Sequence, residues 1–131
     1  MKQGFVKVAS ATPRIRVADP VYNAQVICEQ AKEAAEHGAK IVVFPELCIT
    51  GYTCNDLFLQ ELLLEKAKEA LLTIVEETGQ LEALFLVGLP VDKDGRLYNV
   101  AAVLYRGRIL GMIPKKNIPM YAEFYEGRHF T

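Results

Sequence analysis

Residues 19–44 read DPVYNAQVICEQAKEAAEHGAKIVVF, and this stretch determines the fold class. Asp19-Pro20 is a typical helix start, with Asp as the N-cap and Pro in the first turn. Small and apolar residues then recur at helical spacing until Gly38, which marks the helix end. The run 41–44 is continuously apolar, as in a strand buried on both faces of a parallel sheet. With a strand predicted over residues 5–10, this gives a β-α-β unit with parallel strands.

After this unit, the sequence changes from alternating elements to strands alone. A second helix is predicted over residues 59–77 and ends at Gly79. Its apolar stripe consists of Leu59, Leu62, Leu63, Ala67, Ala70, Leu71, Ile74 and Val75. Three strands follow, and Asp94-Gly95 is a hairpin signal between the first two. These strands are predicted over residues 83–91, 97–105 and 109–113. The order β-α-β-α-β-β-β defines a layered α/β fold.

Composition excludes several classes of function. The net charge is −1, so no basic excess exists to bind nucleic acid. Apolar runs are shorter than the roughly 20 residues of a membrane span, and no signal peptide is recognisable, so we expect a cytoplasmic protein without a membrane partner. Three cysteines in apolar surroundings fit a reducing compartment. The two histidines, His37 and His129, are far apart, and no C-x-x-C spacing occurs, so no metal site is expected.

Two charged residues directly follow predicted strands. Glu46 comes after the run 41–44, and Lys115 comes after the strand 109–113. Functional groups gather at the carboxyl ends of parallel strands, so the two can meet at one edge of the sheet. There the carboxylate can act as a general base and the ammonium can stabilise an oxyanion. An exposed loop glutamate and a lysine that reaches out to water are the simpler alternatives, and the residues alone leave both open.

A short loop dense in aromatic and acidic residues follows Lys115. It contains Tyr121, Phe124 and Glu126. Such a loop after a strand end is typical of a substrate-binding lip. Alternatively, its aromatic rings pack onto the core.

The motifs around both charged residues resemble those of a known superfamily. The stretches 44–46 (FPE) and 50–52 (TGY) are similar to the glutamate motif of the carbon–nitrogen hydrolase (nitrilase) superfamily, and 114–121 (PKKNIPMY) resembles its lysine motif. GYTCNDLF at 51–58 and YAEFYEGRHF at 121–130 resemble the glutaminase domain of bacterial glutamine-dependent NAD synthetases. The resemblance implies that residues 1–131 are the N-terminal part of a nitrilase-like α-β-β-α sandwich. The rest of that sandwich and the synthetase domain are absent from this sequence.

The resemblance also implies an activity for the parent enzyme. A Glu-Lys-Cys triad would hydrolyse glutamine to glutamate and ammonia, with Glu46 as the base and Lys115 stabilising the tetrahedral intermediate. Four residues would line the glutamine pocket: Tyr52, Tyr121, Phe124 and Glu126. The parent would use the ammonia to amidate deamido-NAD with ATP and Mg in its synthetase domain, and it would be a homo-oligomer. This chain itself carries no G-x-G-x-x-G loop and is expected to hold no cofactor.

The nucleophile is the missing part of the triad. In the superfamily it follows the lysine motif, whereas Cys28, Cys48 and Cys54 all precede it. We therefore expect the chain to be inactive alone. Two other interpretations stay open. The parent could be a stand-alone amidase or carbamoylase of the same superfamily, or the chain could be a non-catalytic interaction module that pairs through exposed sheet surface.

Overall fold

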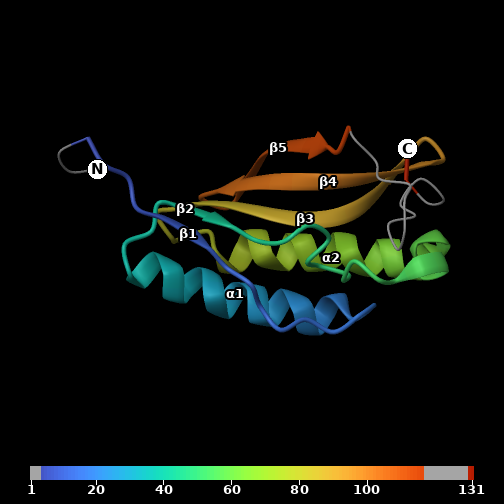
Figure 1. Ribbon diagram of the computed structural model, residues 1–131, viewed down its shortest axis with the longest axis horizontal. Coiled ribbons are helices and arrows are strands. Elements are labelled where there is room, and N and C mark those ends of the chain that lie inside the picture. Colours follow the sequence, from blue (N-terminus) through green and yellow to red (C-terminus); the bar gives the residue numbers. More distant parts are fainter. Residues whose placement is uncertain (1–3, 117–129) are drawn as a thin grey trace.

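The computed structural model describes residues 4–116 and 130–131. A five-stranded sheet and two long helices form two layers of this part of the chain (Figure 1). In chain order the elements are β1 (Val8–Ser10), α1 (Pro20–Glu36), β2 (Ile41–Val43), the 3₁₀ helix η1 (Asn55–Leu59), α2 (Glu61–Glu77), β3 (Leu84–Lys93), β4 (Arg96–Tyr105) and β5 (Arg108–Pro114). The strands follow one another in sequence order across the sheet. The pairs β1–β2 and β2–β3 are parallel, and β3–β4 and β4–β5 are antiparallel, which confirms the predicted α/β order.

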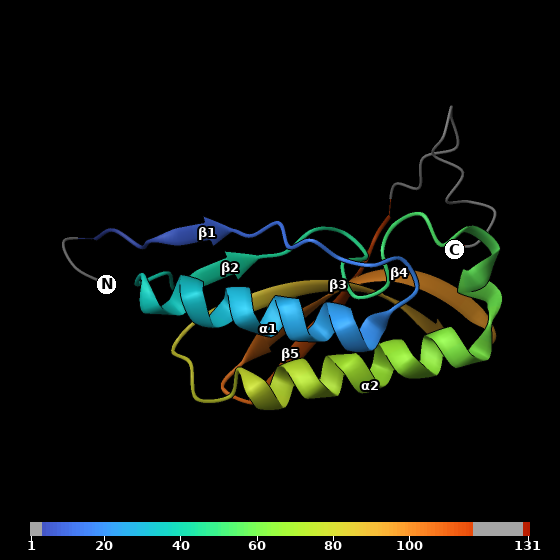
Figure 2. The same cartoon turned by 90° about the horizontal axis from the view of Figure 1, so that it is seen from below.

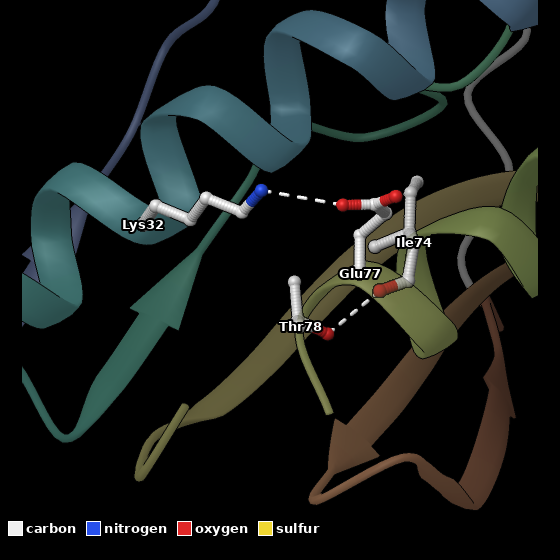
Figure 3. Close-up of polar contacts among 4 residues, drawn as sticks. All are labelled: Lys32, Ile74, Glu77 and Thr78. Carbon is white, nitrogen blue, oxygen red and sulfur yellow. Dashed lines mark hydrogen bonds and ion pairs between the residues drawn. The ribbon is translucent and has the colours of Figure 1, made fainter. Parts of the chain in front are cut away.

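Side-chain hydrogen bonds lie at the start of α1 and at the end of α2. The side chain of Asp19 accepts a hydrogen bond from the backbone N–H of Tyr22 at the start of α1. At the end of α2, the Thr78 hydroxyl donates to the carbonyl of Ile74 over 2.7 Å (Figure 3). Close to this end, Lys32 of α1 pairs with Glu77 of α2 over 3.2 Å (Figure 3).

The core lies between the helices and one face of the sheet. Its largest fully buried side chains in the described part include Ile27 of α1, Leu71 and Ile74 of α2, and Val42, Phe85, Val87, Leu89 and Leu104 of the strands. The predicted stripe of α2 is buried at Leu63, Ala67, Ala70, Leu71 and Ile74. Leu59 and Leu62, however, are 62% and 68% exposed. The prediction was wrong for these two. Leu59 lies in η1, before α2 begins, and Leu62 lies outside the face that α2 turns toward the sheet.

The other face of the sheet is open among the described residues. Both helices cover the same face, as the two views show (Figures 1 and 2). In β2, Val42 is buried under the helices, but Ile41 and Val43 are 37% and 43% exposed. The prediction of a strand buried on both faces was therefore wrong here. A continuous apolar run indicates two covered faces, and only one has a cover in the described part of the chain.

Two tight turns join the antiparallel strands. Asp94-Gly95 has φ values of +53° and +76°, and Arg106-Gly107 has +48° and +77°. Left-handed backbone at both central residues is what a two-residue hairpin requires. The turn predicted at Asp94-Gly95 is confirmed. Within the described residues, neither helix has the length and apolar character needed to cross a membrane.

Candidate active site

Glu46 lies in a tightly folded loop that leaves the carboxyl end of β2. Leu47 has a φ of +53°, and its carbonyl accepts a hydrogen bond of 2.7 Å from the N–H of Gly51. The N–H of Ile49 donates to the carbonyl of Gly88 on β3 over 3.1 Å. The loop therefore turns back on itself and lies directly on β3, so the position of Glu46 is set by backbone contacts.

Gly88 makes this close approach possible. A Cβ atom at Gly88 would lie 2.9 Å from the carbonyl oxygen of Pro45 and 3.1 Å from the carbonyl carbon of Glu46, and closer still to the nitrogen of Leu47. All three are backbone atoms, which cannot move without moving the loop. Only a residue without a side chain allows the loop to pack this closely on β3.

A buried asparagine holds the loop from the other side. Asn23 of α1 is fully buried. Its side chain donates to the carbonyls of Arg16 and Ile49 over 2.8 and 2.9 Å and accepts from the N–H of Arg16 over 2.7 Å. All these partners are main-chain groups, so Asn23 ties the Glu46 loop and the segment before α1 to the helix.

Lys115 follows β5 at the same border of the sheet. Its N–H donates to the carbonyl of Asn99 on β4 over 2.7 Å. Its ammonium nitrogen Nζ lies 2.5 Å from Oε1 of Glu46. Sequence reasoning predicted that these two residues meet, and the structure places them together. Both side chains are only partly exposed, at 29% for Lys115 and 39% for Glu46.

Asn99 is a third member of this cluster, which sequence reasoning missed. Its amide nitrogen Nδ2 donates to Oε1 of Glu46 over 2.9 Å, and the residue is 3% exposed. A signal was available in the sequence, because Asn99 is a polar residue in the otherwise apolar strand LYNVAAVLY at 97–105. Buried polar side chains need partners, and among the described residues the Asn99 amide has the carboxylate of Glu46 as a partner.

The cluster lies beside a hollow of about 310 Å³. Apolar residues of β2, β3, β4 and β5 make most of its lining, including Val43, Leu86 and Ile113. Glu46, Asn99 and Lys115 also line it and supply its polar groups. A small apolar hollow with a few convergent polar groups is the usual form of a binding site for a small molecule. A carboxylate and an ammonium at its wall can move a proton and stabilise a developing negative charge.

Of the four residues predicted to bind substrate, Tyr52 is the one that lies in the described part of the chain. Tyr52 packs against a second apolar cluster that includes Leu47, Phe58 and Leu97, and it is not among the residues that line the hollow. Tyr121, Phe124 and Glu126 lie outside the described residues. The role of all four residues in binding glutamine stays a prediction.

The three cysteines of the chain are all buried and free. Burial raises the pKa of the Cys48 thiol to about 11. The pKa of the Cys28 thiol is also raised to about 11, mainly by burial and to a smaller extent by the nearby Glu77 carboxylate. Burial also raises the pKa of Cys54, whose sulfur lies 3.2 Å from the carbonyl oxygen of Thr50. A raised pKa keeps a thiol protonated, whereas a nucleophile acts as the thiolate. These cysteines therefore have the environment of structural residues. In the described part of the chain, no group of three His, Cys, Asp or Glu is arranged to hold a metal ion.

Comparison with known proteins identifies the family. The family model described as carbon-nitrogen hydrolase matches residues 7–130, so the chain belongs to the carbon-nitrogen hydrolase family. The glutamine-dependent NAD(+) synthetase of Mycobacterium tuberculosis strain H37Rv is 41% identical over 130 residues, which are 99% of this chain and 19% of that protein. The chain thus spans about a fifth of the length of the curated relatives it matches.

Solved structures show the same likeness at the level of the fold. The glutamine-dependent NAD+ synthetase of Acinetobacter baumannii, solved with ADP, matches 96% of this chain with a TM-score of 0.86 and 31% identity, and the match covers 24% of that chain. An amidase from Nesterenkonia sp. matches all of this chain with a TM-score of 0.79 and 22% identity, over 49% of its own length. The second likeness is one of fold alone. The described elements therefore correspond to a portion of the nitrilase fold.

Proposed function

We propose that this chain is the N-terminal part of the glutaminase domain of a longer glutamine-dependent NAD synthetase. The observation that carries this proposal is the contact between Glu46 and Lys115 beside an apolar hollow. The identity of 41% over nearly the whole chain supports the synthetase as the parent. A stand-alone amidase is less well supported, because the solved amidase shares only the fold.

In this proposal Glu46 is the general base and Lys115 stabilises the oxyanion. Glu46 takes the proton from a cysteine thiol, and the sulfur bonds to the side-chain carbonyl carbon of glutamine. The ammonium of Lys115 stabilises the negative charge that develops on the carbonyl oxygen. The C–N bond then breaks, the nitrogen receives the proton held by Glu46, and ammonia leaves. Water attacks the thioester, with Glu46 again accepting a proton. The C–S bond breaks, glutamate is released and the thiol regains its proton.

In this proposal the nucleophilic cysteine belongs to a part of the parent enzyme outside this sequence. Cys28, Cys48 and Cys54 are buried, with raised pKa values. The 131-residue chain alone therefore has no glutaminase activity in our proposal. Ammonia would pass to a synthetase domain that amidates deamido-NAD with ATP and Mg. The ADP bound to the Acinetobacter baumannii synthetase supports the use of ATP. A cytoplasmic homo-oligomer is the form we expect for the parent.

The test separates the glutamine-using step from the synthetase step. In the full-length enzyme, Glu46→Gln should abolish NAD formation from glutamine but leave NAD formation from added ammonium salt unchanged. The purified 131-residue chain should release no ammonia from glutamine. Glutamine-dependent NAD formation that survives Glu46→Gln would contradict the proposed role of Glu46. Release of ammonia by the 131-residue chain would contradict the proposal that its nucleophile lies elsewhere.

A further inference from the structure

Asn99 contacts both halves of the Glu46–Lys115 pair, although it has neither charge nor nucleophilic character. Its side-chain amide donates to Oε1 of Glu46, and its main-chain carbonyl accepts the N–H of Lys115. Because Asn99 lies within β4, the sheet holds its backbone in place. One rigid strand residue therefore fixes where the carboxylate points and where the chain that carries the ammonium leaves the sheet.

The two contacts of the Glu46 carboxylate end on the same oxygen. Nδ2 of Asn99 lies 2.9 Å and Nζ of Lys115 lies 2.5 Å from Oε1. Oε2 makes no hydrogen bond or ion pair with any other residue in the ranges 4–116 and 130–131. Of the two donors, the ammonium is on a flexible four-carbon stem that can rotate away. The amide is on a short side chain that is 3% exposed, so it is the more rigid anchor.

We propose that Asn99 is a positioning residue for the general base, holding Oε1 of Glu46 so that Oε2 is presented to the proton of the nucleophile. This inference rests on the proposed function, because it assumes that Glu46 accepts a proton. Proton transfer requires the acceptor oxygen to be within hydrogen-bond reach of the donor. A carboxylate free to rotate would occupy that geometry only part of the time. Asn99 removes that rotation without adding a charge that would compete with Lys115.

The experiment uses the full-length enzyme with Asn99→Ala and Asn99→Asp. The alanine variant removes the donor, and the aspartate variant keeps the shape but replaces the donor by an acceptor that repels Glu46. Both keep the main-chain carbonyl that anchors Lys115. Tyr98→Phe is the matched control, because Tyr98 is the neighbouring residue on β4 and packs against the core instead.

With glutamine as donor, kcat should fall about 10- to 100-fold in Asn99→Ala and further in Asn99→Asp, the range expected for a lost hydrogen bond to a charged, oriented group. KM for glutamine should change less than about threefold, because orientation of the base acts on the chemical step. NAD formation from ammonium salt should stay at the wild-type level, and Tyr98→Phe should match the wild type in both assays.

Three other results would decide against parts of this argument. Unchanged kcat with glutamine in both Asn99 variants would overturn the positioning role. A parallel loss with glutamine and with ammonium salt would also overturn it, because it would show that Asn99 only supports the fold. Failure of the wild-type enzyme to use glutamine at all would instead refute the proposed function, so the two failures are distinguishable.

Discussion

Gly88→Ala tests whether close packing of the Glu46 loop on β3 sets the active-site geometry. The added Cβ would lie 2.9 Å from the carbonyl oxygen of Pro45 and 3.1 Å from the carbonyl carbon of Glu46. Favourable contacts between carbon atoms lie at about 3.5–4.0 Å, so the loop would have to retreat by roughly 0.5–1 Å. Inserting a methyl group into such a packed place costs about 1–3 kcal/mol of unfolding free energy.

The same retreat would act on the chemistry more strongly than on the fold. The hydrogen bond from Asn99 to Glu46 is 2.9 Å long. A lengthening of about 1 Å would take it beyond the roughly 3.2 Å limit of an N–H···O bond. Misplacement of a reacting group by about 1 Å can cost about 100-fold in rate. We therefore expect Gly88→Ala to lower glutamine hydrolysis by the full-length enzyme about 100-fold and to leave ammonium-dependent NAD formation unchanged.

Gly111→Ala is the matched control for this prediction. Gly111 also lies in a strand, β5, but a Cβ there would meet no atom within 4 Å. Urea unfolding of the two variants of the chain, followed by circular dichroism, measures the cost to stability, and the glutaminase assay measures the cost to activity. Equal stability and equal activity of the two variants would refute the reasoning, because only one of them forces the loop to move.

Two further predictions concern buried groups near the site. Asn23→Ala leaves main-chain groups of Arg16 and Ile49 without their buried partner, which should cost about 1–3 kcal/mol in urea unfolding. The substitution Gln25→Ala, at an exposed position of the same helix, should change stability by less than about 0.5 kcal/mol. Equal losses of stability in the two variants would contradict the idea that Asn23 acts as a clamp, that is, that its side chain holds the main chain of Arg16 and Ile49 in place. For Cys48, the pKa is 9.0 in the absence of burial and about 11 in the folded chain, so the neutral thiol favours the folded state. The difference in unfolding free energy between the wild type and Cys48→Ala should be constant below pH 9 and should shrink as the pH rises toward 11. A difference that grows over that pH range would contradict the burial of this thiol.

Local signals in the sequence were sufficient to predict most elements of the fold. The ends of α1 could be predicted from Asp19-Pro20 and Gly38, because a cap and a left-handed residue act on their own neighbours. Asp94-Gly95 defined its hairpin for the same reason. The meeting of Glu46 with Lys115 followed from a general rule about strand ends rather than from contacts between the residues.

The parts that sequence reasoning missed depend on contacts between distant residues. Asn99 is 53 positions from Glu46, and nothing in strand β4 indicates that its amide meets that particular carboxylate. The requirement for glycine at position 88 of β3 was missed for the same reason. It arises from close contact with the backbone of the Glu46 loop, which is distant in the sequence. The open face of the sheet is a different kind of error. Apolar residues such as Ile41 and Val43 indicate that a surface is to be covered, but periodicity does not indicate which part of a protein covers it.

The Glu46–Lys115 ion pair contributes too little energy to hold the fold in place. The surrounding fold instead determines where the two side chains lie. Both side chains are partly exposed, and ion pairs of this kind contribute about 0–1 kcal/mol to stability. The Glu46 loop is instead held by neutral contacts, namely the clamp of Asn23 and the close packing on Gly88. Such contacts do not depend on whether Glu46 is protonated. The loop can therefore keep its position while the charge on the carboxylate changes, as the role of general base that we propose for Glu46 requires.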